Sequence, residues 1–189
     1  MDRALEGTHR VGKQVMLYRA DKRVFLPWSK IATAGSFIQK HPLGGKEVEE
    51  MLEASRPPDK LGRADALFLF ENQAHALEHC VKMTGGRLYK VSVPSEAVTH
   101  RADMRLVDAM LPAILAADFE VGRQLAEQYW AGRMDAEAVV EVLVHTASVS
   151  CEIPLSKVDR LRLTGVTSYD PSQDEDDAEL LERLNKQFE

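Results

Sequence analysis

The hydrophobic pattern is clearest between residues 63 and 93, where it predicts a strand, a helix and a second strand. Residues 66–70 form an apolar run with a charged residue on each side, and their length and aromatic content favour a buried strand. Asn72 predicts the start of the helix because its side-chain oxygen can accept an unpaired amide of the first turn. Gly85-Gly86 predicts its end, since glycine reaches the left-handed conformation at low cost. Residues 88–93 then alternate as a strand does.

The same criteria predict further elements on both sides of this unit. Strands are expected over 14–19, 148–153 and 158–166. Helices are expected over 46–55 and from about 103 to 131, the second one broken around Pro112. Residues 20–45 are rich in turn formers and predict a long ordered loop with at most one short strand or helical turn, and 94–102 predict a connection.

The segment 139–144 has two interpretations. Its run of β-branched residues around Glu141 predicts a strand. Alternatively, Asp135 could cap a helix that continues through Val144. The first interpretation places a carboxylate inside a strongly apolar strand, whereas the second places an ordinary glutamate on a helix surface.

The order of these elements predicts the fold class. Strands and helices are partly segregated along the chain, which favours an α+β fold with mixed, mainly antiparallel sheets over a doubly wound sheet. The sequence contains no G-x-G-x-x-G, no P-loop and no H-E-x-x-H motif. We therefore expect a single domain over 1–170, long enough to bury its own core.

Residues 171–189 differ from the rest of the chain in their charge. The chain has a net charge of -6. Residues 171–189 hold seven acids and two bases, which gives -5 and leaves -1 for residues 1–170. This segment predicts either a mobile acidic tail or a short helix that docks on the domain or on a partner. The nearly neutral domain argues against a strong nucleic-acid-binding surface, which needs clustered basic residues.

The remaining composition is typical of a globular protein in a reducing compartment. Hydrophobic residues make up 44% and charged residues 29% of the chain. No apolar run approaches the roughly 18 residues of a membrane span, and the first residues do not resemble a signal peptide. Cys80 and Cys151 have no zinc-like spacing and predict two buried or half-buried thiols. We expect the cytoplasm of the producing cell or of a target cell.

Two charged residues stand out as candidates for chemistry. Arg19 lies at the end of a predicted strand, so it either reaches water there or binds a carboxylate, phosphate or carbonyl. Glu141, if it lies in a strand, must pair with a cation or face a cleft.

Other candidates also have a purely structural interpretation. Phe68 and Phe70 point the same way and belong either to the core or to a pocket wall, and Tyr129-Trp130 is more typical of a core than of a ligand stack. Arg63 can reach phosphates, although a loop arginine is usually solvated. His75 and His79 are four apart but lack a third metal ligand, so no metal site is expected.

The order and local sequence of residues 14–165 resemble those of small bacterial and phage ADP-ribosyltransferase-like domains. The segments that carry the resemblance are Leu17-Tyr18-Arg19, then Arg63 to Phe70, Leu88 to Val93, Tyr129 to Gly132, and Glu141 to Val144. The resemblance implies sheets that form a cleft with flanking helices and an NAD substrate. It also implies a toxin, effector or phage modifier.

By this resemblance, Arg19 would hold an NAD phosphate and Glu141 would act at the ribose, stabilising the oxocarbenium-like transition state. Tyr18, Arg63, Phe68 and Phe70 would complete the NAD site. A bidentate arginine suits a phosphate, and a carboxylate suits positive charge that develops at an anomeric carbon.

The sequence departs from the family pattern at two places. Residues 66–70 occupy the strand where Ser-Thr-Ser is expected, and Val139 replaces the first residue of the E-x-E or Q-x-E signature. Three functions remain open, and one of them is a nucleotide-handling enzyme of another class. In the other two, the chain is an enzyme that transfers ADP-ribose to a protein or nucleic acid or to water, or it is an inactive binding or regulatory module on the same fold. An antitoxin or immunity partner is compatible with the transfer of ADP-ribose.

Overall fold

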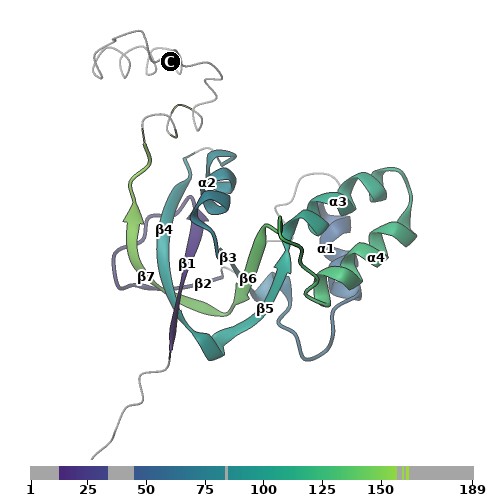
Figure 1. Cartoon of the computed structure of the whole chain (residues 1–189), viewed down its shortest axis with the longest axis horizontal. Coiled ribbons are helices and arrows are strands. Elements are labelled where there is room, and N and C mark those ends of the chain that lie inside the picture. Colours follow the sequence, from purple (N-terminus) through teal and green to yellow (C-terminus); the bar gives the residue numbers. More distant parts are fainter. Residues whose placement is uncertain (1–12, 34–44, 84, 157–158, 160, 162–189) are drawn as a thin grey trace, which may run out of the picture.

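A single antiparallel sheet organises the computed structural model of this chain, which describes residues 13–33, 45–83, 85–156, 159 and 161. The sheet has seven strands in the order β2-β7-β4-β1-β3-β6-β5 (Figure 1). Every paired neighbour is antiparallel. The α+β fold class predicted from the sequence is confirmed. The strands are β1 (Gln14–Asp21), β2 (Lys30–Ala32), β3 (Leu67–Phe70), β4 (Arg87–Pro94), β5 (Val98–Asp103), β6 (Val140–Val144) and β7 (Thr146–Ile153).

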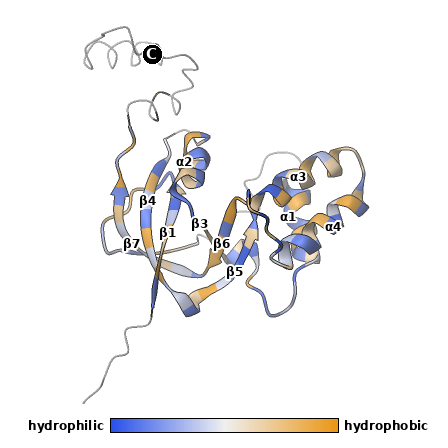
Figure 2. Cartoon of the chain, in the orientation of Figure 1, coloured by the Kyte–Doolittle hydropathy of each residue, from blue (hydrophilic) through white to orange (hydrophobic). Residues whose placement is uncertain are grey.

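The helices form two separate groups (Figure 1). Helices α1, α3 and α4 contact one another at the end of the molecule that holds β5 and β6, whereas α2 packs against β1, β3 and β4. Their amphipathic character is visible in Figure 2, where hydrophobic and hydrophilic residues alternate along α3 and α4. The helices are α1 (Gly45–Ala54), α2 (Gln73–Val81), α3 (Met104–Leu115) and α4 (Phe119–Trp130), with short 3-10 turns η2 (Arg63–Asp65) and η3 (Ser95–Ala97).

Three groups of buried side chains form the core. The first comes from the sheet and includes Leu17, Leu69, Tyr89 and Val142. The other two join strands to helices. One brings Phe68 and Leu143 to α1, α3 and α4, and the other brings Phe70, Ala20 and Leu88 to α2. Phe68 and Phe70 are two residues apart on β3, and their side chains pack against different groups of helices.

The predicted strand–helix–strand unit is present. Asn72 caps α2, with its side-chain oxygen accepting from the amide of Ala74. The helix ends at Val81, and Gly85 takes the left-handed conformation (φ 71°) in the turn that follows. Val140–Val144 forms a strand rather than a helix, so the neighbours of Glu141 along the chain are apolar strand residues.

Several sequence-based expectations were wrong. Residues 98–103 form strand β5 rather than the expected connection. The strand was not predicted because Thr99 and Arg101 obscure its short alternation of apolar and polar residues. The helix break lies at 116–118 and not at Pro112, which α3 accommodates. Cys151 is exposed, on a strand whose pairing shifts register at Lys90 and Val91.

Two expectations fall wholly or mostly on residues outside those described. The acidic segment 171–189 is one of them. The strand expected over 158–166 is the other, and its two described positions, Asp159 and Leu161, have helical backbone.

Candidate functional site

A cavity of about 440 Å³ lies between the two helix groups, over β3. The residues that line this cavity come from strands β1, β3 and β6, from the turn η2, and from helices α1, α2 and α3 with the turn after α2. This volume is within the usual range of small-molecule sites, about 300–1,000 Å³. Its lining residues are Arg19, Ala20, Glu49, Arg63, Phe68, Phe70, His79, Met83, Met104, Val107, Asp108 and Glu141.

Arg19 enters this wall from the end of β1. Strands β1 and β3 pair at Tyr18 and Phe70, and Arg19 Nη1 donates to the carbonyl of Phe68 beyond that pair, at 2.8 Å. Its Nε and Nη2 donate to Asp21 Oδ2 at 3.1 and 2.8 Å. Arg23 binds the same carboxylate from the solvent side, where 44% of its side chain is exposed. Asp21 thus joins an arginine of the cavity to an arginine of the surface.

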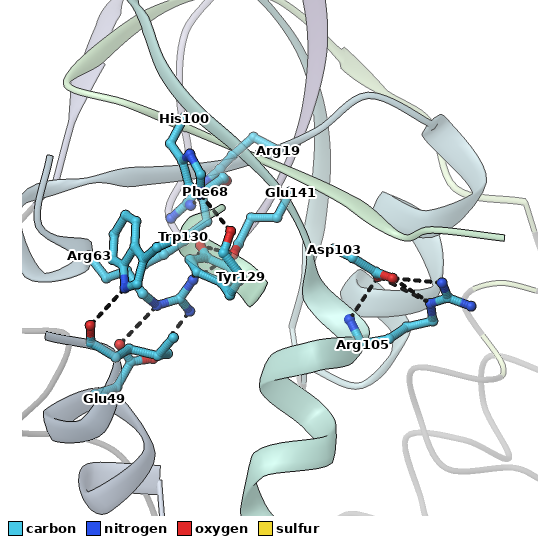
Figure 3. A network of polar contacts seen from close by, with 11 residues as sticks. Arg19, Glu49, Arg63, Phe68, His100, Asp103, Arg105, Tyr129, Trp130 and Glu141 are labelled. Carbon is cyan, nitrogen blue, oxygen red and sulfur yellow. Dashed lines mark hydrogen bonds and ion pairs between the residues drawn. The ribbon is translucent and has the colours of Figure 1, made fainter. Parts of the chain in front are cut away.

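Glu141 belongs to a second polar cluster, which is almost completely buried (Figure 3). Its Oε1 accepts hydrogen bonds from Arg63 Nη1 at 2.5 Å and from the Tyr129 hydroxyl at 2.8 Å. Arg63 also donates through Nε and Nη2 to the two oxygens of Glu49, at 2.9 and 3.1 Å. The side chains of Arg63, Glu49 and Glu141 are 7%, 3% and 4% exposed. Two carboxylates therefore share one guanidinium, in a fork geometry that arginine provides and lysine does not.

Both clusters shift the pKa values of their members. Burial alone would raise the pKa of Asp21, but the hydrogen bonds and charges of Arg23 and Arg19 outweigh it and lower the pKa to about 2.

Burial opposes the charge of Arg63, yet Glu141, Tyr129 and Glu49 raise its pKa well above the ordinary value. Burial raises the pKa of Tyr129 well above its usual range, and the neighbouring Glu141 adds to this effect. Arg63 is therefore charged and Tyr129 is a neutral hydrogen-bond donor at all physiological pH values.

Two aromatic residues, Phe68 and Phe70, also line the cavity. The Arg63 guanidinium lies 4.6 Å from the ring centre of Phe68, a cation–π distance. Phe70 is 5.4 Å from the ring of His79, and burial lowers the pKa of this histidine. The cavity wall thus contains two aromatic residues in addition to Arg19 and Glu141.

The structure brings five of the six candidate residues to one cavity: Arg19, Arg63, Phe68, Phe70 and Glu141. Tyr18 lies elsewhere and lines a separate open hollow at the start of α2. Arg63 is not solvated, because Glu49 and Glu141 bind it inside the protein.

Sequence reasoning missed Glu49 and the role of the Tyr129 hydroxyl. Glu49 was not singled out in the sequence, although it is three positions before the fully buried Leu52 and therefore lies on the same helix face. Tyr129 was expected in the core, where its ring does pack, and a buried tyrosine hydroxyl usually needs a partner. These two signals, taken with an isolated Glu141, could have indicated the cluster.

No family model, curated protein or solved structure matches this chain. Among the described residues, no group of three or more His, Cys, Asp or Glu is placed to hold a metal ion. None of the helices in the described part of the chain is long and apolar enough to cross a membrane.

Proposed function

We propose that this chain is an NAD-dependent, ADP-ribosyltransferase-like enzyme that cleaves the bond between nicotinamide and ribose. The observation that carries the proposal is that Arg19 and Glu141, 122 residues apart in sequence, line the same cavity with Phe68 and Phe70. This arrangement supplies a cation, an aromatic surface and a carboxylate in one site, as NAD requires. The resemblance of residues 14–165 to ADP-ribosyltransferase-like domains supports the same assignment.

Arg19 would bind the diphosphate of NAD. A guanidinium has five N–H donors, and the contacts with Asp21 and Phe68 use three of them. The remaining two can donate to phosphate oxygens, while the contacts already made hold the group in place. Its side chain is 16% exposed, so it reaches the cavity without being freely solvated.

Glu141 would act at the reacting carbon. When the glycosidic bond breaks, its electron pair leaves with nicotinamide, and positive charge develops on the ribose. A carboxylate fixed beside that carbon stabilises the charge without reorganising. The acceptor, a macromolecule or water, then bonds to the anomeric carbon and loses its proton. Phe68 and Phe70 would pack against the nicotinamide ring.

Calorimetric titration with NAD tests the binding part of this proposal. We expect the wild-type chain to bind NAD and Arg19→Ala to bind it about 10- to 100-fold more weakly, since a hydrogen-bonded charge contributes about 1.5–3 kcal/mol. Arg23→Ala is the matched control, because Arg23 binds the same Asp21 carboxylate without lining the cavity. Equal losses in both variants, or no binding by wild type, would contradict the assignment of Arg19.

The alternative, an inactive binding module, is tested in the same samples by measuring nicotinamide release. The missing glutamate or glutamine at Val139 is the feature that favours it. A chain that binds NAD with Arg19 but releases no nicotinamide would support the binding module. Growth arrest on expression, relieved by Arg19→Ala, would instead favour a toxin acting in the cytoplasm, with a protein or nucleic acid as acceptor.

A further inference from the structure

We infer that Arg63 and Tyr129 are positioning residues that fix the carboxylate of Glu141 by one oxygen and leave the other to face the cavity. The inference rests on the proposed function, because it describes how the site prepares Glu141 for the reaction. It goes further by assigning a role in holding Glu141 to Arg63, which lines the cavity, and to Tyr129, which lies behind it.

The hydrogen bonds of Glu141 are strongly one-sided. Oε1 accepts from both Arg63 Nη1 and the Tyr129 hydroxyl. The described residues offer Oε2 no hydrogen-bond donor, and Glu141 contributes to the cavity wall. A buried carboxylate held through one oxygen keeps a defined orientation, so its other oxygen is directed at a single place.

The groups that hold Glu141 are themselves fixed. Glu49 binds Arg63 through two parallel hydrogen bonds, and Phe68 lies against the guanidinium. Tyr129 lies on α4, where it is fully buried in the core cluster shared with α1 and α3. Its ring also packs on His100 and Trp130. This support keeps the positions of both donors to Oε1, as preorganised catalytic sites require.

The charge balance of the cluster suits a cationic transition state. Glu49 and Glu141 together carry two formal negative charges against the single positive charge of Arg63. Tyr129 is neutral, since its pKa is raised by burial and by Glu141. The cluster therefore stays attractive to positive charge in the cavity, even though Glu141 is paired. A fully neutralised ion pair would lack this property.

Removal of single hydroxyl groups separates positioning from simple structural support. Tyr129→Phe keeps the buried ring and deletes one donor to Glu141. The matched control is Tyr89→Phe, because Tyr89 is also fully buried and its hydroxyl contacts the backbone of Arg23 and Phe25, away from the cavity. We expect kcat for nicotinamide release to fall about tenfold in Tyr129→Phe with KM for NAD within about twofold, and both constants to be unchanged in Tyr89→Phe.

Conservative replacement of Arg63 gives a second readout. Arg63→Lys keeps the charge but loses the several N–H donors of the planar guanidinium. We therefore expect its kcat to lie between those of wild type and Arg63→Gln. Wild-type kcat in both Tyr129→Phe and Arg63→Lys would overturn the positioning role and leave the proposed function intact. If wild type neither binds NAD nor releases nicotinamide, the proposed function fails, and the inference fails with it.

Discussion

The two polar clusters that meet at the cavity differ in their access to water. The Arg19–Asp21–Arg23 cluster reaches the surface, and nearly half of the Arg23 side chain is exposed. The Glu49–Arg63–Glu141 cluster is buried, with all three side chains less than a tenth exposed. The first cluster can therefore exchange partners with water and with a ligand, whereas the second is fixed when the protein folds.

This difference matches the two tasks of the proposed reaction. Binding a diphosphate requires donors that can leave water and adjust to an entering ligand, and the contacts within the described part of the chain occupy only three of the five donors of Arg19. Stabilising a short-lived cation requires a charge that does not move, and Glu141 is held by two donors from different elements. Changes in the buried cluster should thus affect stability and turnover most, and changes in the surface cluster should affect binding and pH dependence.

The largest expected effect comes from breaking the buried cluster. Arg63→Met leaves Glu49 and Glu141 without their cation, and an unpaired buried charge costs about 3–5 kcal/mol of unfolding free energy. Urea denaturation measures the loss. A change below about 1 kcal/mol would show that water reaches this cluster as it reaches the first one.

Removing all three charges together should restore most of that stability. Glu49→Leu, Arg63→Met and Glu141→Leu in one chain should bring the unfolding free energy back to within about 2 kcal/mol of wild type, because well-packed apolar groups often replace buried ion pairs without loss. The same chain should release no nicotinamide. Recovery of stability without activity would show that the charges serve the reaction rather than the fold.

A smaller effect is expected from pH in the surface cluster. The pKa of Asp21 is about 2 in the folded protein, against 3.8 for an unperturbed aspartate. A lowered pKa contributes stability above the unfolded value, so the contribution is present above about pH 4 and is lost as the pH falls toward 2. After allowance for solvent around Arg23, we expect about 1–2 kcal/mol. Wild type should lose this amount relative to Asp21→Asn between pH 5 and pH 2 in denaturant titrations, and parallel curves would contradict it.

Salt should produce the smallest effect and should distinguish the clusters directly. Raising NaCl from about 0.05 M to about 0.5 M should reduce the destabilisation caused by Asp21→Asn by about 0.5 kcal/mol or less, because screening acts on charges near the surface. The destabilisation caused by Arg63→Met should stay the same. Equal salt dependence of the two variants would remove the distinction between exposed and buried clusters.

Local patterns allowed most elements of the fold to be predicted from the sequence. The cap at Asn72, the alternation of β4 and the apolar run of β3 each depend on residues close in sequence. Strand β5 was missed because its length is short and its alternation mixes His100 and Arg101 with apolar positions. Tertiary pairing with β6, which no local pattern contains, determines this strand.

The candidate site was predictable in part. Glu141 and Arg19 stood out because each charge lies in or at the end of an apolar strand. The buried partners of Glu141 were not predictable, since Glu49, Arg63 and Glu141 come from three separate segments that packing brings together. Asp21, the ion-pair partner of Arg19, is two residues away on the same strand. Tyr18 lines a different hollow from Arg19, because neighbouring residues of a strand point to opposite faces of the sheet.

Release of nicotinamide by Glu141→Gln at saturating NAD tests whether the charge of Glu141 stabilises the transition state. The substitution keeps the shape of the side chain and removes its charge. We expect wild type to release nicotinamide and Glu141→Gln to release it about 10²- to 10³-fold more slowly, with NAD affinity within about threefold of wild type. Full turnover by Glu141→Gln, or no release by wild type, would contradict the account.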